Sequence, residues 1–332
     1  MSGHKRDLLA MLGAFVVGSL TVFQSRINGQ LGISLNDGFF AAWLSFGVGL
    51  LAVLVIVAVV PSFRASLGSL RAAVRPNAQG KRGIQPWQLL GGLGGATFVA
   101  GQGLTIRYLG VAIFTVAVVA AQNGSSLLVD RAGLGPAGVE PITFVRLAAA
   151  VIATFGVVIA VAGKLDSPSF RLWALGFALL AGAAIAVQQA INGRVGVAAG
   201  SPWAAGVTNF VVGFAGLTIA LLISRLVNPR AWIWPPAPWN EPGLWLGGFI
   251  GVAFIVMAAA VVRIIGVLMF ALASILGQIV TALAVDALFP TPGSQITWSL
   301  VLGIFVTAAA VILAGVSRQV RAHKAAKSLQ SN

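Results

Sequence analysis

The sequence predicts an all-α integral membrane protein with ten transmembrane helices in two inverted five-helix repeats. Three observations lead to this prediction: an apolar composition, a series of long apolar stretches and a polar motif that occurs twice. Hydrophobic residues form 58% of the chain and charged residues 8%, against about 45–50% and about 25% in an average soluble domain. Apolar stretches near or above 18 residues recur along the whole chain, and each is long enough to cross a bilayer as a helix.

Turn residues and charges separate the apolar stretches from one another. The N-terminal stretch is predicted to be an uncleaved first helix, because no small-x-small cleavage site follows it promptly. The ten expected helices are Leu8–Leu35, Phe39–Val60, Trp87–Ile106, Gly110–Asp130, Ile142–Ala162, Leu172–Ala199, Trp203–Ser224, Leu244–Val262, Gly266–Asp286 and Ile296–Val316.

The motif QSRINGQLG at residues 24–32 returns as QQAINGRVG at residues 188–196, which is 164 positions later. Further matches follow at an offset of 156, among them Gly110 with Gly266 and Asp130 with Asp286. Self-similarity at a fixed offset indicates duplicated structural units. We therefore expect one membrane domain built from a first half, residues 1–165, and a second half, residues 166–332.

Five helices are an odd number, so the second half must enter the membrane from the side opposite to the first. The charges agree with this, because positive residues gather on the cytoplasmic side of membrane proteins. With both termini cytoplasmic, fourteen of the 21 Lys and Arg residues lie on that side, five lie outside, and Arg26 and Arg146 fall within spans. The sequence thus predicts a multi-pass protein of the cell inner (plasma) membrane.

The doubled Q-x-x-I-N-G-x-h-G element, in which h is apolar, the five-helix unit and the opposed orientation together resemble the drug/metabolite transporter superfamily. Within it, the chain is similar to YdcZ-like membrane proteins in fused, two-unit form, over nearly its whole length. The resemblance implies a secondary transporter that exports a small metabolite or drug-like compound. Inverted repeats are the structural basis of alternating access. Relatives in the small multidrug branch carry an acidic residue in the first helix, but neither Leu8–Leu35 nor Leu172–Ala199 contains one, so proton/drug antiport does not carry over.

Gln24 and Asn28 lie one helical turn apart on one face, as do Gln188 and Asn192. Amides in hydrocarbon demand partners, and the glycine after each asparagine lets the helix unwind or another backbone approach. One interpretation is a polar substrate site between the halves. The other is that Asn-Gly ends a shorter helix and the glutamine ties two helices together.

Other polar residues fall within the expected helices. Gln122 and Gln278 sit a little past the centres of equivalent helices and are candidates to face the same cavity, or else to tie helices together. Arg26, whose counterpart is Ala190, is a candidate to contact an anionic group, to pair with a carboxylate, or to snorkel outward.

Asp130 and Asp286 are the only acidic pair repeated between the halves. They are candidates for ion coupling or, at helix ends, for interfacial residues paired with basic groups. Arg131 is the expected partner of Asp130.

Several chemistries are not expected. The chain has no Cys, and both His residues, His4 and His323, lie in the tails, so neither a metal cluster nor a nucleophilic triad is predicted. Without a P-loop, ATP-driven pumping is not expected either. We therefore expect no enzyme activity and no cofactor. No nucleic-acid partner is expected either, because the net charge of +14 is spread over loops and tails rather than gathered in one patch.

The expected partners are the lipid bilayer and a small-molecule substrate, and the sequence leaves open a homo-oligomer. Two rival functions also remain: a lipid-handling carrier, and a non-transporting membrane scaffold or regulatory protein.

Overall fold

In the computed structural model, which describes residues 3–76, 80 and 82–330, all regular secondary structure is helical. The all-α prediction is therefore confirmed. The helices are α1 (Gly3–Ser34), α2 (Gly38–Val59), α3 (Pro61–Val74), η1 (Pro86–Gly91), α4 (Gly92–Arg131), α5 (Phe144–Ala162), α6 (Leu172–Ala198), α7 (Pro202–Val227), η2 (Pro242–Trp245), α8 (Leu246–Leu288) and α9 (Trp298–Gln330).

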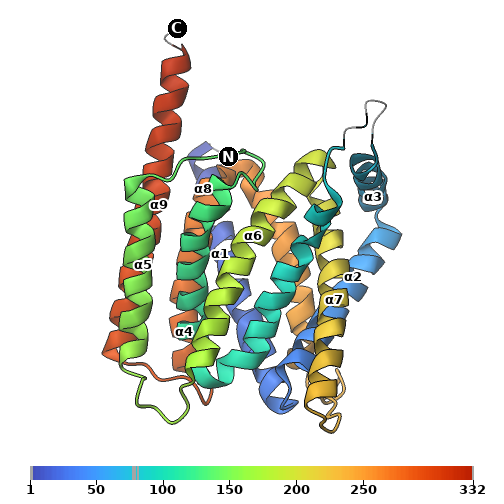
Figure 1. Ribbon diagram of the computed structural model, residues 1–332, viewed down its shortest axis with the longest axis vertical. Helices are drawn as coiled ribbons and strands as arrows, with labels where there is room; N and C mark the ends of the chain where they lie inside the picture. Colours follow the sequence, from blue (N-terminus) through green and yellow to red (C-terminus); the bar gives the residue numbers. More distant parts are fainter. Residues whose placement is uncertain (1–2, 77–79, 81, 331–332) are drawn as a thin grey trace.

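Over the described residues, eight helical segments are long and apolar enough to cross a membrane, and Trp298–Ala314 is a shorter apolar helix. The long helices stand side by side in one bundle, with both ends of the chain at the same end of it (Figure 1). We call this the terminal end and the other one the opposite end. One of the eight segments, Pro86–Arg131, has 46 residues, about twice the roughly 20 that a single crossing needs.

Helix α4 folds back on itself at Gly110. The backbone there has φ 77° and ψ 170°, in a region that glycine adopts far more readily than other residues. The segments just before and just after α4 meet the same part of α6: Gly91 lies against Asn192, and Arg194 Nε donates to the Gly135 carbonyl at 3.0 Å. Because Gly110 lies between these two contacts, the chain makes a helical hairpin.

Helix α8 makes a second hairpin at Gly266, where φ is 76° and ψ is 165°. Its first part runs along α1, with Gly251 against Gln24. Its second part returns along the same helix, where Thr281 Oγ1 donates to Ser19 Oγ at 2.8 Å. Each of the two glycines thus joins a pair of helices that the sequence predicts separately.

The two hairpins cross between the halves of the chain. Helix α1 packs most extensively against α8, while α6 packs most extensively against α4. The contacts match position by position. Gly247 lies against Asn28, and Gly91 lies against Asn192. Gly91 and Gly247 are equivalent at the offset of 156, and Asn28 and Asn192 are equivalent at the offset of 164, so the two contacts correspond to each other.

Glycine allows the helix backbones to touch at these crossings. A Cβ atom at Gly18 would lie 2.7 Å from the Ser274 carbonyl carbon, and one at the equivalent Gly182 would lie 3.0 Å from the Val118 carbonyl carbon. Both distances are shorter than ordinary contacts, so no larger residue fits without moving a helix. Small residues at helix interfaces are the usual means of close packing in membranes.

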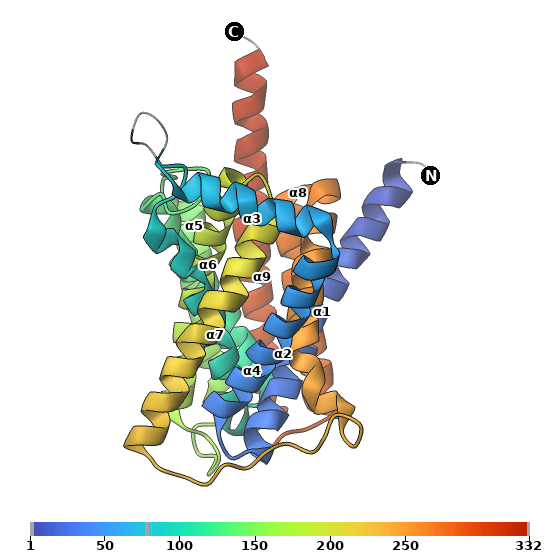
Figure 2. The same ribbon diagram turned by 90° about the vertical axis from the view of Figure 1, so that its right-hand side faces the viewer.

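Helix α3 was not predicted; residues 61–86 were expected to form a loop. Its apolar residues Phe63, Leu67, Leu70 and Val74 recur with helical spacing, and the Phe63 ring lies 4.1 Å from that of Trp203. The helix lies across the terminal end of the bundle rather than along it (Figure 2). Its basic residues are typical of a loop between two spans, although its apolar residues have this helical periodicity.

The prediction that Asn-Gly ends a shorter helix is wrong. Gly29 lies inside α1 and Gly193 inside α6, and both helices continue to Ser34 and Ala198. The glycine instead allows close packing, because Gly29 lies against the side chain of Ile106.

Substitutions at two glycines of α6 test the role of close packing. A methyl group at Gly182 would lie 2.9 Å from Ala121 Cβ, whereas one at Gly176 meets nothing within 4 Å. We expect Gly182→Ala to destabilise the protein by about 1–3 kcal/mol through overpacking. Gly176→Ala should be neutral or stabilising by up to about 1 kcal/mol, since alanine favours helix. Thermal unfolding of the purified protein in detergent measures both, and equal effects would contradict the packing argument.

Candidate functional site

The motif on α1 faces the start of α8 and the first part of α4. Gln24 Nε2 donates to the Gly247 carbonyl at 3.0 Å. Asn28 is 0% exposed, and its Nδ2 donates to Gln102 Oε1 at 2.6 Å. Gln102 in turn donates to Ser25 Oγ at 2.8 Å. Three amides and a hydroxyl thus form one buried polar cluster, which we call the α1 cluster.

The motif on α6 is organised around one residue of α7. Gln188 Nε2 donates to Asn209 Oδ1 at 2.6 Å, and Asn192 Nδ2 donates to the same oxygen at 3.3 Å. Asn209 is buried, and Gln188 and Asn192 are half-buried. Gln188, Asn192 and Asn209 form the α6 cluster.

The four predicted amides therefore form two clusters, and no hydrogen bond among the described residues joins them. Sequence reasoning missed Gln102 and Asn209. Both carry an amide inside a long apolar stretch, which was a usable signal, but neither is matched in the other half: the equivalent residues are Ala258 and Ser45.

Each cluster contains one buried oxygen that accepts no hydrogen bond from the described residues. These atoms are Asn28 Oδ1 and Gln188 Oε1. Asn28 Oδ1 lies against Gly247, and Gln188 Oε1 lies against Gly95. These two glycines are not equivalent residues of the repeat. A buried acceptor without a donor costs about 1–3 kcal/mol, so both oxygens are prepared to accept an N–H or O–H group.

The structure places Gln122 against α6, at a residue outside the α6 cluster. Its Nε2 donates to Gln189 Oε1 at 3.0 Å, and Gln189 is the residue that follows Gln188. Gln278 is half-buried on α8, and the described hydrogen bonds do not connect it to either cluster. The two glutamines thus differ in their surroundings.

Asp286 and Asp130 occupy different environments. Asp286 is 3% exposed, so its carboxylate lies inside the protein near the end of α8. Its carboxylate accepts from the backbone N–H groups of Val111 and Ala112 at 3.0 and 2.8 Å and from Ser294 Oγ at 2.6 Å. It therefore caps the second part of α4 from another helix.

Asp130 is only partly buried and pairs with Arg146 at the start of α5, with 2.5 Å between Oδ2 and Nη2. The expected partner Arg131 was wrong. Arg131 follows Asp130 directly and is exposed, and neighbouring residues of a helix do not face each other.

Arg26 binds uncharged acceptors. Its Nε donates to the Phe289 carbonyl at 3.0 Å and its Nη1 to Gln30 Oε1 at 2.9 Å. It lines a cavity of about 410 Å³ at the opposite end of the bundle. The other lining residues are Ile27, Gln30, Glu241, Gly243, Leu244 and Phe289.

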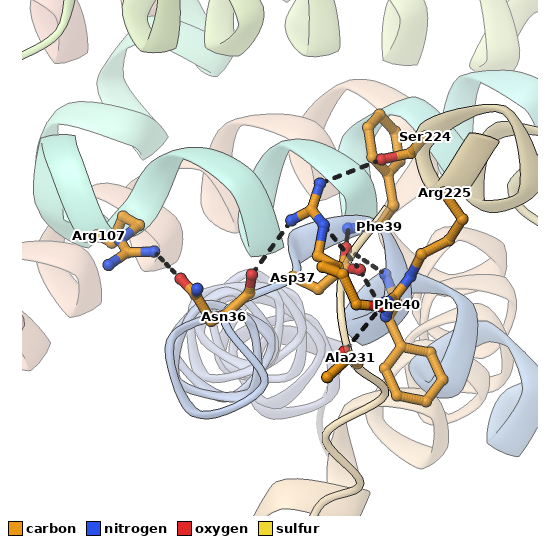
Figure 3. Close-up of polar contacts among 9 residues, drawn as sticks. Asn36, Asp37, Phe39, Phe40, Arg107, Ser224, Arg225 and Ala231 are labelled. Carbon is orange, nitrogen blue, oxygen red and sulfur yellow. Dashed lines mark hydrogen bonds and ion pairs between the residues drawn. The ribbon is translucent and has the colours of Figure 1, made fainter. Parts of the chain in front are cut away.

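A second polar group at the opposite end ties the segment after α7 to the turn between α1 and α2 (Figure 3). Asp37 is buried and caps α2, accepting from the N–H groups of Phe39 and Phe40 at 3.1 Å each. Arg225 Nη2 lies 2.9 Å from its other oxygen, while Arg107 Nη1 donates to Asn36 Oδ1 at 2.9 Å. These contacts fasten the opposite end.

Lys164 adds a buried cation at the same end. It is 1% exposed, and its amino group donates to the Leu109 carbonyl at 3.0 Å, next to the turn at Gly110. Burial lowers the pKa of Lys164 to about 8, although the nearby charge of Asp286 favours the protonated form.

Among the described residues, no group of three His, Asp or Glu side chains lies close enough to hold a metal ion.

The family described as "Putative inner membrane exporter, YdcZ" matches residues 9–159 and 173–313. The chain belongs to the YdcZ family. The predicted resemblance is therefore confirmed, and the protein is a multi-pass membrane protein of a family named for inner-membrane export. The gap between the matched segments, residues 160–172, covers the end of α5 and the loop before α6.

Twelve chains of solved structures are similar to this YdcZ-family protein. One, described only as "Crystal structure of protein", has a TM-score of 0.53 and 16% sequence identity, and the similarity covers 95% of this chain and 98% of that one. At this identity the likeness shows the fold alone. No curated protein matches the sequence.

The lowered pKa of Lys164 gives a pH test. Between pH 8 and 10.5 the unfolded lysine still holds a proton that the folded one has released, so stability rises with pH across this range. We expect the melting temperature of the wild type to rise relative to that of Lys164→Met between these pH values. Parallel pH profiles for the two proteins would show that Lys164 is not buried as described.

Proposed function

We propose that this YdcZ-family protein is a secondary transporter that exports a small polar metabolite or drug-like compound by alternating access. The observation that carries the proposal is the crossed packing of α1 with α8 and of α6 with α4, in which equivalent residues of the two halves make equivalent contacts. Two similar units that each pack a helix onto the other unit are suited to exchanging conformations.

The proposal includes ten membrane crossings. The part of the chain that the structure describes holds eight candidate spans and one shorter apolar helix, and we propose that the hairpin at Gly110 divides the longest of these spans into two crossings. Each half then has five crossings, and the second half is inverted relative to the first. The first half ends near residue 165 and the second begins near residue 166, within the loop between α5 and α6.

The terminal end is proposed to be cytoplasmic. It carries α3 with Arg64 and Arg71 as well as the basic C-terminal tail, while the opposite end carries the Trp- and Pro-rich segment 231–239. Positive residues favour the cytoplasmic side, and aromatic residues are enriched at membrane interfaces.

The α1 and α6 clusters are the proposed substrate contacts. All four motif amides already donate to protein acceptors, as they would if they only tied helices together. Support for binding comes from the two unpaired oxygens, Asn28 Oδ1 and Gln188 Oε1, because they need donors. The substrate is then a neutral or zwitterionic molecule with N–H or O–H groups, recognised by hydrogen bonds rather than by charge, and not a purely cationic one.

Other predicted residues have subsidiary places in this proposal. Gln122 contacts the helix of the α6 cluster through Gln189 and would extend that site, while Gln278 would join it after a change of conformation. Arg26, in its cavity at the outer end, would contact an anionic group of the substrate. Asp130 and Asp286 are the proposed coupling residues.

Ligand-dependent stability tests the substrate site. A ligand at about 100 times its dissociation constant stabilises a fold by roughly 2.7 kcal/mol. We expect a polar compound from a metabolite and drug panel to raise the melting temperature of the wild type, and the shift to vanish in Asn28→Leu and Asn192→Leu. Thr97→Val, at a half-buried position of α4 that belongs to neither cluster, is the control and should keep the shift.

A shift that survives both substitutions would move the site away from the clusters. If only lipids raised the melting temperature, the protein would be a lipid-handling carrier. If nothing raised it, the scaffold alternative would replace transport.

Topology can be tested with single cysteines, since the chain has none of its own. Ser69 on α3 and Asn240 after α7 are both exposed. We expect an impermeant maleimide to label Asn240→Cys from outside intact cells and to label Ser69→Cys only after the membrane is opened. Labelling of both from one side would exclude the proposed arrangement.

A further inference from the structure

The turns at Gly110 and Gly266 have the same backbone geometry but different surroundings. Their φ angles are 77° and 76° and their ψ angles 170° and 165°. Gly110 is buried, whereas Gly266 is exposed. Since the two glycines are equivalent in sequence and backbone, the difference between them lies in what the rest of the protein does at each end.

At Gly110 the opposite end of the bundle is tightly closed. The Asp286 carboxylate binds the N–H groups of Val111 and Ala112, the first free amides of the returning helix. A Cβ atom at Gly110 would lie 2.8 Å from Asp286 Oδ2 and 3.0 Å from Ser294 Cα. On the other side of the turn, Lys164 caps the Leu109 carbonyl. An anion at the start of one helix and a cation at the end of the other suit both helix dipoles.

At Gly266 no described atom lies within 4 Å of the position that a Cβ would take. The residue two positions earlier, Ile264, is 40% exposed. The carboxylate equivalent to Asp286 is Asp130, which lies 156 positions earlier. It is held by Arg146 instead, with Glu140 3.7 Å from the same guanidinium. Among the contacts of the described residues, Asp130 therefore does not cap the turn at the terminal end as Asp286 caps its counterpart.

We propose that Asp286 and Asp130 are alternating latches, each of which closes one end of the bundle by capping the hairpin turn of the other half. The structure has the Asp286 latch closed and the Asp130 latch open. In the opposite state, Asp130 leaves Arg146 and accepts the backbone N–H groups of residues 267 and 268, while Asp286 releases those of Val111 and Ala112. The inference rests on the proposed inverted repeat.

In this exchange Asp130 moves from one favourable partner to another, while Asp286 gives up its cap and keeps only the positive charges beside it. Asp286 in its closed position has the positive charges of Arg26 and Lys164 near it, and Asp130 in its open position has that of Arg146. A carboxylate that moves between a helix start and an arginine remains stabilised by hydrogen bonds in both places. The two states can therefore have similar free energies, as alternating access requires.

Two single cysteines report the two ends. Ala112→Cys is a conservative change at a residue that is 0% exposed beside the Asp286 latch, and Ile264→Cys lies at the open turn. In vesicles of known orientation, we expect an impermeant maleimide to label Ile264→Cys from the cytoplasmic side and to label Ala112→Cys hardly at all.

Breaking the Asp286 latch should reverse this pattern. Asp286→Asn loses the charge and one of the two N–H contacts, so we expect the labelling rate of Ala112→Cys from outside to rise about tenfold and that of Ile264→Cys to fall, as for the loss of hydrogen bonds to a charged group. Adding Asp130→Asn removes the second latch and should restore the labelling of Ile264→Cys.

A simple structural role predicts otherwise. If Asp286→Asn raises labelling at both cysteines, the substitution loosens the fold and the proposal is wrong. It is also wrong if Asp130→Asn does not restore the labelling of Ile264→Cys. Should Asp286→Asn fail to fold, Ser294→Ala, which removes one hydrogen bond to Asp286, should shift both labelling rates in the same directions by a smaller factor.

The experiment separates the latch from the proposed function. If the two cysteines label from the same side of the membrane, the inverted arrangement itself fails. If they label from opposite sides but do not respond to the latch substitutions, only the latch proposal fails.

Discussion

Close backbone contact between helices of the two halves is the constraint on which the rest of the structure depends. Helices in a bilayer gain little from burying apolar side chains, because lipid is equally apolar, so they associate by close packing and by polar contacts. Gly18 against Ser274 and Gly182 against Val118 provide that packing at equivalent places. These glycines therefore allow the close helix crossings that join one half of the chain to the other.

The polar clusters depend on the same contacts. Asn28 can reach Gln102, and Gln188 can reach Asn209, because glycines bring the helices that carry them close together. Hydrogen bonds in hydrocarbon are difficult to replace once broken, so each amide cluster holds the helix register. In each cluster the amide N–H groups are held by hydrogen bonds within the protein, while one amide oxygen accepts none. This arrangement suits a site in which a ligand binds the free oxygen without moving the helices.

Much of the fold could be predicted because composition and repetition carry it. The membrane class follows from apolar length, and the duplicated motif led to the family. Several helix boundaries are close to the predicted ones, as at Pro61 and Pro202, but α1 begins at Gly3 rather than Leu8 and α9 continues to Gln330 rather than ending at Val316. Helix α3 was not predicted, because its basic residues indicate a loop even though its apolar residues recur with the spacing of an amphipathic helix. The site was harder to predict, because hydrogen-bond partners such as Gln102, Asn209 and Arg146 come from elements distant in sequence, and nothing in the local pattern indicates which amide meets which acceptor.

The unequal halves explain why one end is closed in the structure. Asp130 has Arg146 on the helix that follows it, whereas α9, which follows Asp286, has no basic residue before Arg318. Asp130 thus has an attractive alternative to capping Gly266, while Asp286 has none of that kind and also gains from the positive charge of Lys164 beside Gly110. Charge differences of this sort favour one state of an otherwise symmetric pair. In the proposed exchange, a substrate that binds the two states with different affinity needs only to overcome this difference in free energy, to which the asymmetry of the ion pairs contributes.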